Sequence, residues 1–167
     1  PNSIEILPTL TRLGSYFASR GDTIPVAAVT ELRLLRNILF RDSIKLYLRA
    51  IEIIELNYGV NDLRLLAPLR GLASARMFEI TQRRYAEVAL LRSLEIVDSN
   101  PNSDLTDRAQ AMVDLGDIYI ITSDEKAQEI YLSAWTILQE TPETRRLASS
   151  LFGSPVRLYP RNSPFLY

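Results

Sequence analysis

Apolar residues recur along most of this chain at intervals of three and four, which is the spacing of one face of an α-helix. Leu46, Ala50 and Ile53 show this spacing, and the run from 90 to 97 shows it again. Glycine, proline, asparagine and aspartate, which favour turns, separate these stretches. The pattern predicts an all-α chain with helices over residues 3–20, 25–40, 43–57, 62–80, 84–97, 104–121 and 124–140, and a shorter one over 143–152.

Three aspartates stand at the predicted starts of helices. An aspartate side chain can accept the free amide protons of a first helical turn, so Asp62, Asp104 and Asp124 are expected to be N-caps. The polar run Arg41-Asp42-Ser43 is predicted as another break, which makes 25–40 and 43–57 separate helices.

Three of the predicted helices share one pattern, in which two small residues flank a bulky one at spacings of four and three. Such a face suits a helix that is approached closely by neighbours on both sides. The three copies begin 43 and 41 residues apart, which fits a repeating helical hairpin. They are Ser43, Tyr47, Ala50; Ala86, Leu90, Ser93; and Ala127, Tyr131, Ala134.

The helices that precede these copies repeat as well. They carry Leu13-Gly14-x-x-Phe17, Leu72-Ala73-x-x-Arg76 and Leu115-Gly116-x-x-Tyr119. A glycine inside a helix costs about 0.5–1 kcal/mol relative to alanine, so its use suggests that a neighbouring helix packs on bare backbone. The first repeat is longer than the second by about 16 residues, which is attributed to an inserted helix over 25–40.

The last unit, with Leu115-Gly116-x-x-Tyr119 followed by Ala127, Tyr131 and Ala134, resembles the tetratricopeptide repeat family in its bacterial form with long repeats of about 42 residues. This resemblance implies a right-handed α-α superhelix, or solenoid, of antiparallel helix hairpins with an extended C-terminal tail. The repeat domain is expected over 1–152 and a proline-rich tail over 153–167.

What the resemblance implies for function is recognition of a protein or peptide partner in a groove lined by the first helices of the hairpins. Carried over from the Leu-Gly and Leu-Ala pairs, the groove positions are Arg70, Ser74, Met77, Phe78, Gln110, Val113, Asp117 and Ile120, with Ile121 beside them. For the apolar members, packing in the core is the competing interpretation.

Composition argues against enzymatic chemistry. The chain has no cysteine and no histidine, so thiol nucleophiles, the commonest general base and the favoured transition-metal ligand are all missing. Its glycines form no phosphate-binding motif, and neither a cofactor nor a metal site is expected. A net charge of −1 gives no reason to expect nucleic acid as a partner, and no apolar run reaches the roughly 18–20 residues of a membrane span.

The tail combines three prolines with side chains too apolar for a free segment. It is expected either to cap the last hairpin or to dock on another subunit, with contacts from Leu158, Tyr159, Phe165 and Tyr167. Two functions stay open: an adaptor or accessory subunit of a bacterial envelope complex, and a permanent structural subunit of a larger assembly docked through this tail. The runs 58–72, 108–117 and 151–160 resemble bacterial envelope proteins of this class, and this resemblance, together with the missing cysteine, favours the periplasm over the cytoplasm.

Overall fold

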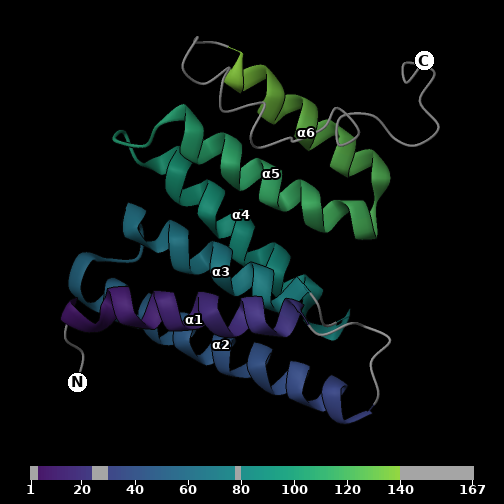
Figure 1. Ribbon diagram of the computed structural model, residues 1–167. Helices are drawn as coiled ribbons and strands as arrows, with labels where there is room; N and C mark the ends of the chain where they lie inside the picture. Colours follow the sequence, from purple (N-terminus) through teal and green to yellow (C-terminus); the bar gives the residue numbers. More distant parts are fainter. Residues whose placement is uncertain (1–3, 24–29, 78–79, 140–167) are drawn as a thin grey trace. The chain divides into compact units, whose positions relative to one another are not determined.

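The computed structural model describes residues 4–23, 30–77 and 80–139, and all regular elements in these ranges are helices (Figure 1). The prediction of an all-α chain is confirmed for this part of the sequence. The short helix predicted over 143–152 and the tail over 153–167 lie outside the described residues. The elements are η1 (Ile4–Ile6), α1 (Leu7–Asp22), α2 (Thr30–Tyr58), η2 (Leu63–Leu65), α3 (Leu66–Met77), η3 (Ile80–Gln82), α4 (Arg83–Ser99), α5 (Leu105–Thr122) and α6 (Asp124–Leu138).

Helix α2 corrects one prediction, because it runs without a break through Arg41, Asp42 and Ser43. The polar side chains in this stretch find partners within a helical geometry. The Asp42 carboxylate pairs with Lys45 at 3.2 Å, and Ser43 Oγ donates to the Gly14 carbonyl of α1 at 2.9 Å. Residues 30–40, attributed to an inserted helix over 25–40, are therefore the N-terminal part of α2, and residues 25–29 lie outside the described residues.

The chain divides into two compact units, Pro1–Ile96 and Val97–Tyr167. The division falls inside α4, and each unit is described by itself. The boundaries predicted for a repeat domain over 1–152 and a tail over 153–167 stay predictions.

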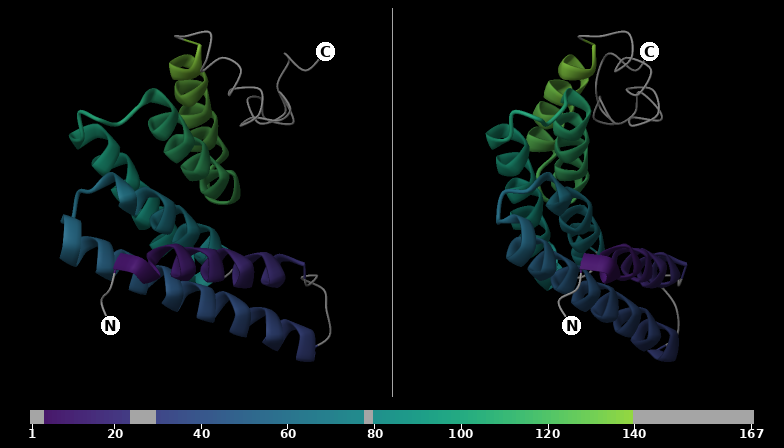
Figure 2. Two further views of the ribbon diagram at one scale, coloured as in Figure 1. Left: turned by 60° about the vertical axis from the view of Figure 1, so that its left-hand side comes forward. Right: turned by 90° about the vertical axis from the view of Figure 1, so that its left-hand side faces the viewer.

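In the first unit, α1 packs along α2, and α3 packs against both of them (Figure 2). Glycines allow the close approach. The Tyr47 ring of α2 lies against the bare backbone of Gly14 on α1 and of Gly71 on α3, and the Phe40 ring lies against Gly21. A β-carbon at position 71 would overlap the Tyr47 ring. The use of glycine in α1 is thus explained by aromatic rings packed on its backbone.

In the second unit, α5 packs against α6 around one apolar cluster. Ala109 and Val113 of α5 meet Ala127, Tyr131, Ala134 and Leu138 of α6 in this cluster. Trp135 is partly buried against it. Gly116 lies against the Tyr131 ring, so a β-carbon there would overlap the ring.

All nine residues of the repeated pattern are buried. Their exposed fractions range from 0% to 3%, for Ser43, Tyr47, Ala50, Ala86, Leu90, Ser93, Ala127, Tyr131 and Ala134. Each triplet therefore lies on the covered face of its own helix, as the spacing predicted. The preceding helices agree less well, because Leu13 is 41% exposed whereas Leu72 and Leu115 are buried. The Leu13 side of α1 is not covered in the way that the same position is covered on α3 and α5.

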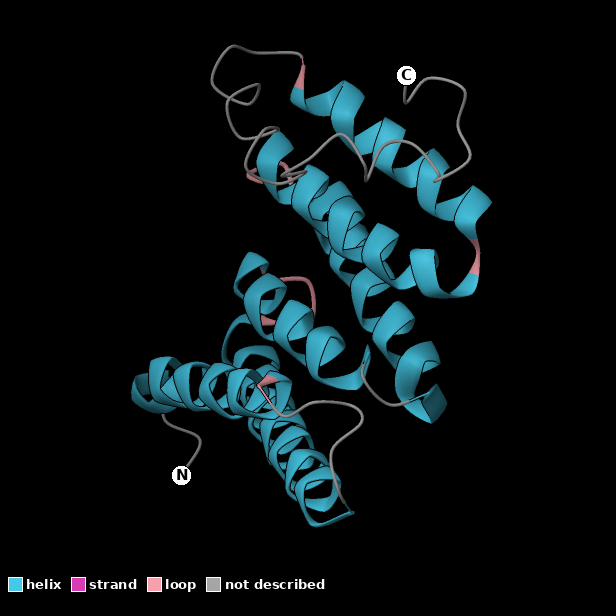
Figure 3. Ribbon diagram, turned by 45° about the vertical axis from the view of Figure 1, so that its right-hand side comes forward, coloured by secondary structure: helices cyan, strands magenta, loops and turns pink. Residues whose placement is uncertain are grey.

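The loops before η2, α5 and α6 lie within the described residues (Figure 3), and they use the expected caps with one exception. Asp62 accepts from the Arg64 amide at 2.9 Å, and Asp104 accepts from the Asp107 amide at 2.7 Å. At α6 the capping residue is Ser123, in an extended conformation, and Asp124 is already helical. After α2, the chain turns at Gly59 with a φ of 98°, a left-handed conformation that favours glycine.

Candidate partner-binding surface

The face predicted for α3 is partly open to solvent. Arg70 and Ser74, one helical turn apart, are both exposed, and Met77 at the end of the helix is half-buried. Phe78, the fourth residue predicted on this face, lies outside the described residues. The charged and hydroxyl side chains are thus the groups that a partner of α3 would meet first.

The face predicted for α5 divides into open and closed positions. Ile120 and its neighbour Ile121 are 48% and 45% exposed, and Gln110 is half-buried with its amide donating to Asp114 Oδ1 at 2.9 Å. Val113 is 2% exposed and belongs to the core shared with α6, which is the competing interpretation of the apolar positions. The described surface of α5 therefore has an apolar end at Ile120 and Ile121.

The Asp117 carboxylate is held by a hydrogen bond from a buried tyrosine of α6. The Tyr131 hydroxyl of α6 donates to Asp117 Oδ1 at 2.6 Å, and the Tyr131 ring is buried against Gly116. A hydrogen bond to a carboxylate is stronger than a neutral one, so this contact fixes the carboxylate relative to the core. The sequence placed Tyr131 in the repeated pattern and Asp117 in the predicted groove, but it did not reveal this bond.

The faces of α3 and α5 lie in different units, Arg70 and Ser74 in the first and Gln110, Asp117 and Ile120 in the second. A groove that combines them stays a prediction. The tail contacts expected from Leu158, Tyr159, Phe165 and Tyr167 fall outside the described residues.

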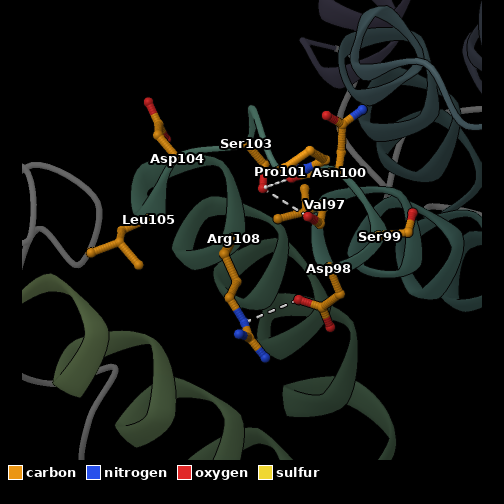
Figure 4. Close-up of a pocket in the computed structure, with 9 residues that line it drawn as sticks. All are labelled: Val97, Asp98, Ser99, Asn100, Pro101, Ser103, Asp104, Leu105 and Arg108. Atoms are coloured by element: carbon orange, nitrogen blue, oxygen red, sulfur yellow. Dashed lines mark hydrogen bonds and ion pairs between the residues drawn. The ribbon is translucent and has the colours of Figure 1, made fainter.

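A hollow of about 610 Å³ lies in the second unit between the end of α4 and the start of α5 (Figure 4). The polar groups that line it contact one another within residues 97–108. Ser103 Oγ lies 2.7 Å from the Val97 carbonyl and 2.8 Å from the Asn100 carbonyl, and Arg108 pairs with Asp98 at 3.3 Å across the hollow. These contacts explain the loop geometry and give the hollow a structural role.

A second hollow, of about 510 Å³, lies in the first unit between the extension of α2 and the end of α3. Ile38, Ile44 and Ala75 form apolar walls, while Arg36 and Arg41 add positive charge. The Arg36 guanidinium stacks over the Phe40 ring at 5.4 Å. Asp22, at the end of α1, is exposed as a residue, but partial desolvation of its carboxyl raises its pKa above the ordinary value of 3.8, and the nearby Arg36 opposes part of this rise.

An apolar stripe on α4 escaped the sequence analysis. Tyr85, Val88 and Leu91 follow one another at spacings of three and are all exposed. A comparison of repeat positions could have found it, because the places equivalent to Val88 hold Lys45 on α2 and Glu129 on α6. The helical periodicity alone hid the stripe, since it counts apolar residues without saying which face is covered.

Two general findings bear on possible sites. Within the described residues, no group of three or more His, Cys, Asp or Glu side chains gathers where it could hold a metal ion. The helices of that same part of the chain contain no stretch long and apolar enough to cross a membrane.

Comparison of the chain with models of protein families, with curated proteins and with solved structures found no match. The tetratricopeptide resemblance therefore depends on this chain's own residues.

Proposed function

We propose that this chain is a non-enzymatic scaffold of the tetratricopeptide type that holds a protein or peptide partner. The observation that carries the proposal is the burial of all nine pattern residues, at equivalent places on α2, α4 and α6. Random surface helices would expose some of these positions. A repeated buried face supports a protein built from stacked hairpins, whose exposed surfaces serve recognition.

The finer architecture is part of the proposal. In the first unit, Gly14 of α1 lies against Tyr47 of α2, whereas Gly21, later in α1, lies against Phe40, earlier in α2. This order of contacts supports an antiparallel hairpin. Repetition of such hairpins would generate the right-handed superhelix that the family resemblance implies.

The residues proposed for recognition are the exposed ones of the first helices, considered in each unit by itself. Arg70 and Ser74 supply a cation and a hydroxyl on α3, and Ile120 and Ile121 supply apolar area on α5. This composition favours an amphipathic peptide over a terminal carboxylate held by a cluster of cations. The role proposed for the chain is that of an adaptor or accessory subunit of a bacterial envelope complex in the periplasm, where the lack of cysteine is compatible with an oxidising environment.

Proximity labelling in the native cell tests this surface. We would compare the unaltered chain with a variant carrying Arg70→Glu and Ile120→Glu, and with a control that carries Arg12→Glu on α1. All three altered side chains are exposed, so the melting temperature should hardly change. Asp117 is left intact, because its replacement would also remove the partner of Tyr131.

The proposal expects the double variant to lose labelled proteins that the control retains. If both variants label the same proteins as the unaltered chain, the surface on α3 and α5 is not the recognition site. Turnover of a small substrate by the purified chain would argue against the non-enzymatic assignment itself.

A further inference from the structure

The outer face of α4 is apolar along its first half. Tyr85, Val88 and Leu91 have exposed fractions of 55%, 56% and 40%, and they lie on one side of the helix at spacings of three. The opposite side holds the buried pattern residues Ala86, Leu90 and Ser93. Contiguous exposed apolar side chains of this size mark interaction surfaces more often than single ones do.

The repeat itself does not require this stripe. The positions equivalent to Tyr85, Val88 and Leu91 are Asp42, Lys45 and Leu48 on α2, and Lys126, Glu129 and Leu132 on α6. On α2 two of these residues form an ion pair, Lys45 with Asp42 at 3.2 Å. A leucine is therefore common to all three helices, while the two apolar residues before it are particular to α4.

The stripe continues toward the end of α2. The Arg92 guanidinium of α4 donates to the Val60 carbonyl at 2.9 Å and pairs with Glu55 at 2.6 Å. These contacts hold Arg92, which follows Leu91, against the turn after α2, where Val60 is 59% exposed. The ion pair with Glu55 also neutralises the charge of Arg92, so the Leu91 end of the stripe carries no unpaired charge from Arg92.

The two ends of the stripe differ in charge. Arg83 and Arg84 directly precede Tyr85, Glu87 stands two residues after it, and the Arg76 guanidinium stacks over the Tyr85 ring at 5.4 Å. Beyond Leu91 the same face carries Glu95, which is exposed like Arg84. One end is thus basic and the other acidic, which is the arrangement that lets a surface complement itself when one copy is turned around.

We infer that the Tyr85–Val88–Leu91 stripe binds the same stripe of a second copy, with the two α4 helices antiparallel about a twofold axis near Val88. In this arrangement Tyr85 of one copy packs near Leu91 of the other. Arg84 of each copy lies opposite Glu95 of its partner, so both ion pairs form at once. The inference concerns the exposed face of α4. It does not depend on the recognition residues proposed for α3 and α5.

The size of the stripe sets the expected strength. Standard interfaces bury about 800 Å² on each partner, and one helix face with a few flanking residues offers less. We therefore expect a weak dimer with a dissociation constant on the order of 100 μM. Such association appears when the local concentration is high, as it is when several copies are held together in a larger assembly.

Sedimentation velocity over a concentration series tests the inference on the complete chain. The first variant is Leu91→Glu, which puts a charge into the stripe. Its matched control is Leu132→Glu, because Leu132 has the same repeat position on α6 and nearly the same exposure, 43% against 40%. The expected result is loss of the dimer in the first variant and an unchanged dissociation constant in the control.

A charge exchange tests the antiparallel geometry. Arg84→Glu and Glu95→Arg should each weaken the dimer about tenfold, because each replaces two attractive pairs by two repulsive ones. A mixture of the two single variants restores both pairs and should recover the original affinity, as should the double variant alone. Circular dichroism checks that every variant is folded.

Two outcomes would overturn the inference. One is a chain that stays monomeric up to about 1 mM, well above the expected dissociation constant. The other is a dimer that Leu91→Glu leaves intact. Recovery in neither the mixture nor the double variant would reject the antiparallel pairing of Arg84 with Glu95.

Discussion

The Tyr131 hydroxyl donates to Asp117 Oδ1 at 2.6 Å, which joins a buried ring of α6 to a carboxylate at the surface of α5. Tyr131→Phe removes this charged hydrogen bond and is expected to cost about 1.5–3 kcal/mol of unfolding free energy. Tyr47→Phe is the matched comparison, because the Tyr47 hydroxyl lies 3.0 Å from Ser15, a neutral and exposed partner. That change should cost only about 0.5–1.5 kcal/mol. Urea unfolding of both variants measures the difference, and equal costs would contradict the special role of Asp117.

Gly116→Ala is expected to destabilise the chain although alanine favours helices. The new β-carbon would overlap the Tyr131 ring, which is 1% exposed and has little room to move. Overpacking costs about 1–3 kcal/mol, which exceeds the gain of up to about 1 kcal/mol in helix propensity. Smaller side chains at position 131 should relieve the overlap. A double-mutant cycle with Tyr131→Leu should therefore show Gly116→Ala to be less harmful in the second background.

The continuity of α2 can be tested with proline. Arg41→Pro would remove a backbone hydrogen bond in the middle of a helix and is expected to cost about 3 kcal/mol or more. A proline at a real helix start is harmless, so Leu105→Pro at the first residue of α5 is the control. Thermal unfolding followed by circular dichroism compares the two. If Arg41→Pro leaves the stability unchanged, α2 is not continuous at this point, and the break predicted from the sequence is correct.

Asp22 should titrate above its ordinary value of 3.8, because burial raises the pKa of its carboxyl in the folded chain more than Arg36 lowers it. A folded pKa above the unfolded one means that the protonated group favours folding below pH 3.8, and that this contribution is lost as pH rises through the folded pKa. Asp22→Asn should thus raise the melting temperature more at pH 7 than at pH 3. An NMR titration midpoint of the Asp22 carboxyl at or below 3.8 would contradict this.

Loss of the Asp104 cap is expected to loosen the first turn of α5. Its carboxylate accepts from the Asp107 amide at 2.7 Å, and Asp104→Ala should cost about 1 kcal/mol. Hydrogen exchange should accelerate at the Asp107 amide and leave amides in the middle of α5 unchanged at low denaturant. Uniform acceleration along the helix would show that the cap acts on global stability alone.

Much of the fold followed from periodicity. The positions of α1 and of α3 to α6 match the predicted helices within a few residues, because each carries apolar residues at helical spacing between strong turn signals. The break predicted at Arg41-Asp42-Ser43 was wrong because polar residues without glycine or proline can continue a helix when their side chains are satisfied. Pairing of Ser43 with Gly14 depends on tertiary contact, which a local pattern does not contain.

The candidate surface was less accessible to sequence reasoning. Repeat register identified Arg70, Ser74 and Ile120, which are exposed, but it also included Val113, which is buried between α5 and α6. An apolar residue on a helix looks the same in sequence whether a neighbour covers it or not. The stripe on α4 shows the converse, since Val88 is exposed and only its counterparts Lys45 and Glu129 reveal that this place normally faces water.

The turn at Gly59 offers a route for chemical modification of the chain. Its φ of 98° is in the range that mirror-image amino acids prefer. A D-alanine introduced there by peptide ligation would restrict the unfolded chain while fitting the folded turn without strain, and would raise stability by about 0.4–1 kcal/mol. The loop after α2 is thus a natural junction for semisynthesis of the chain.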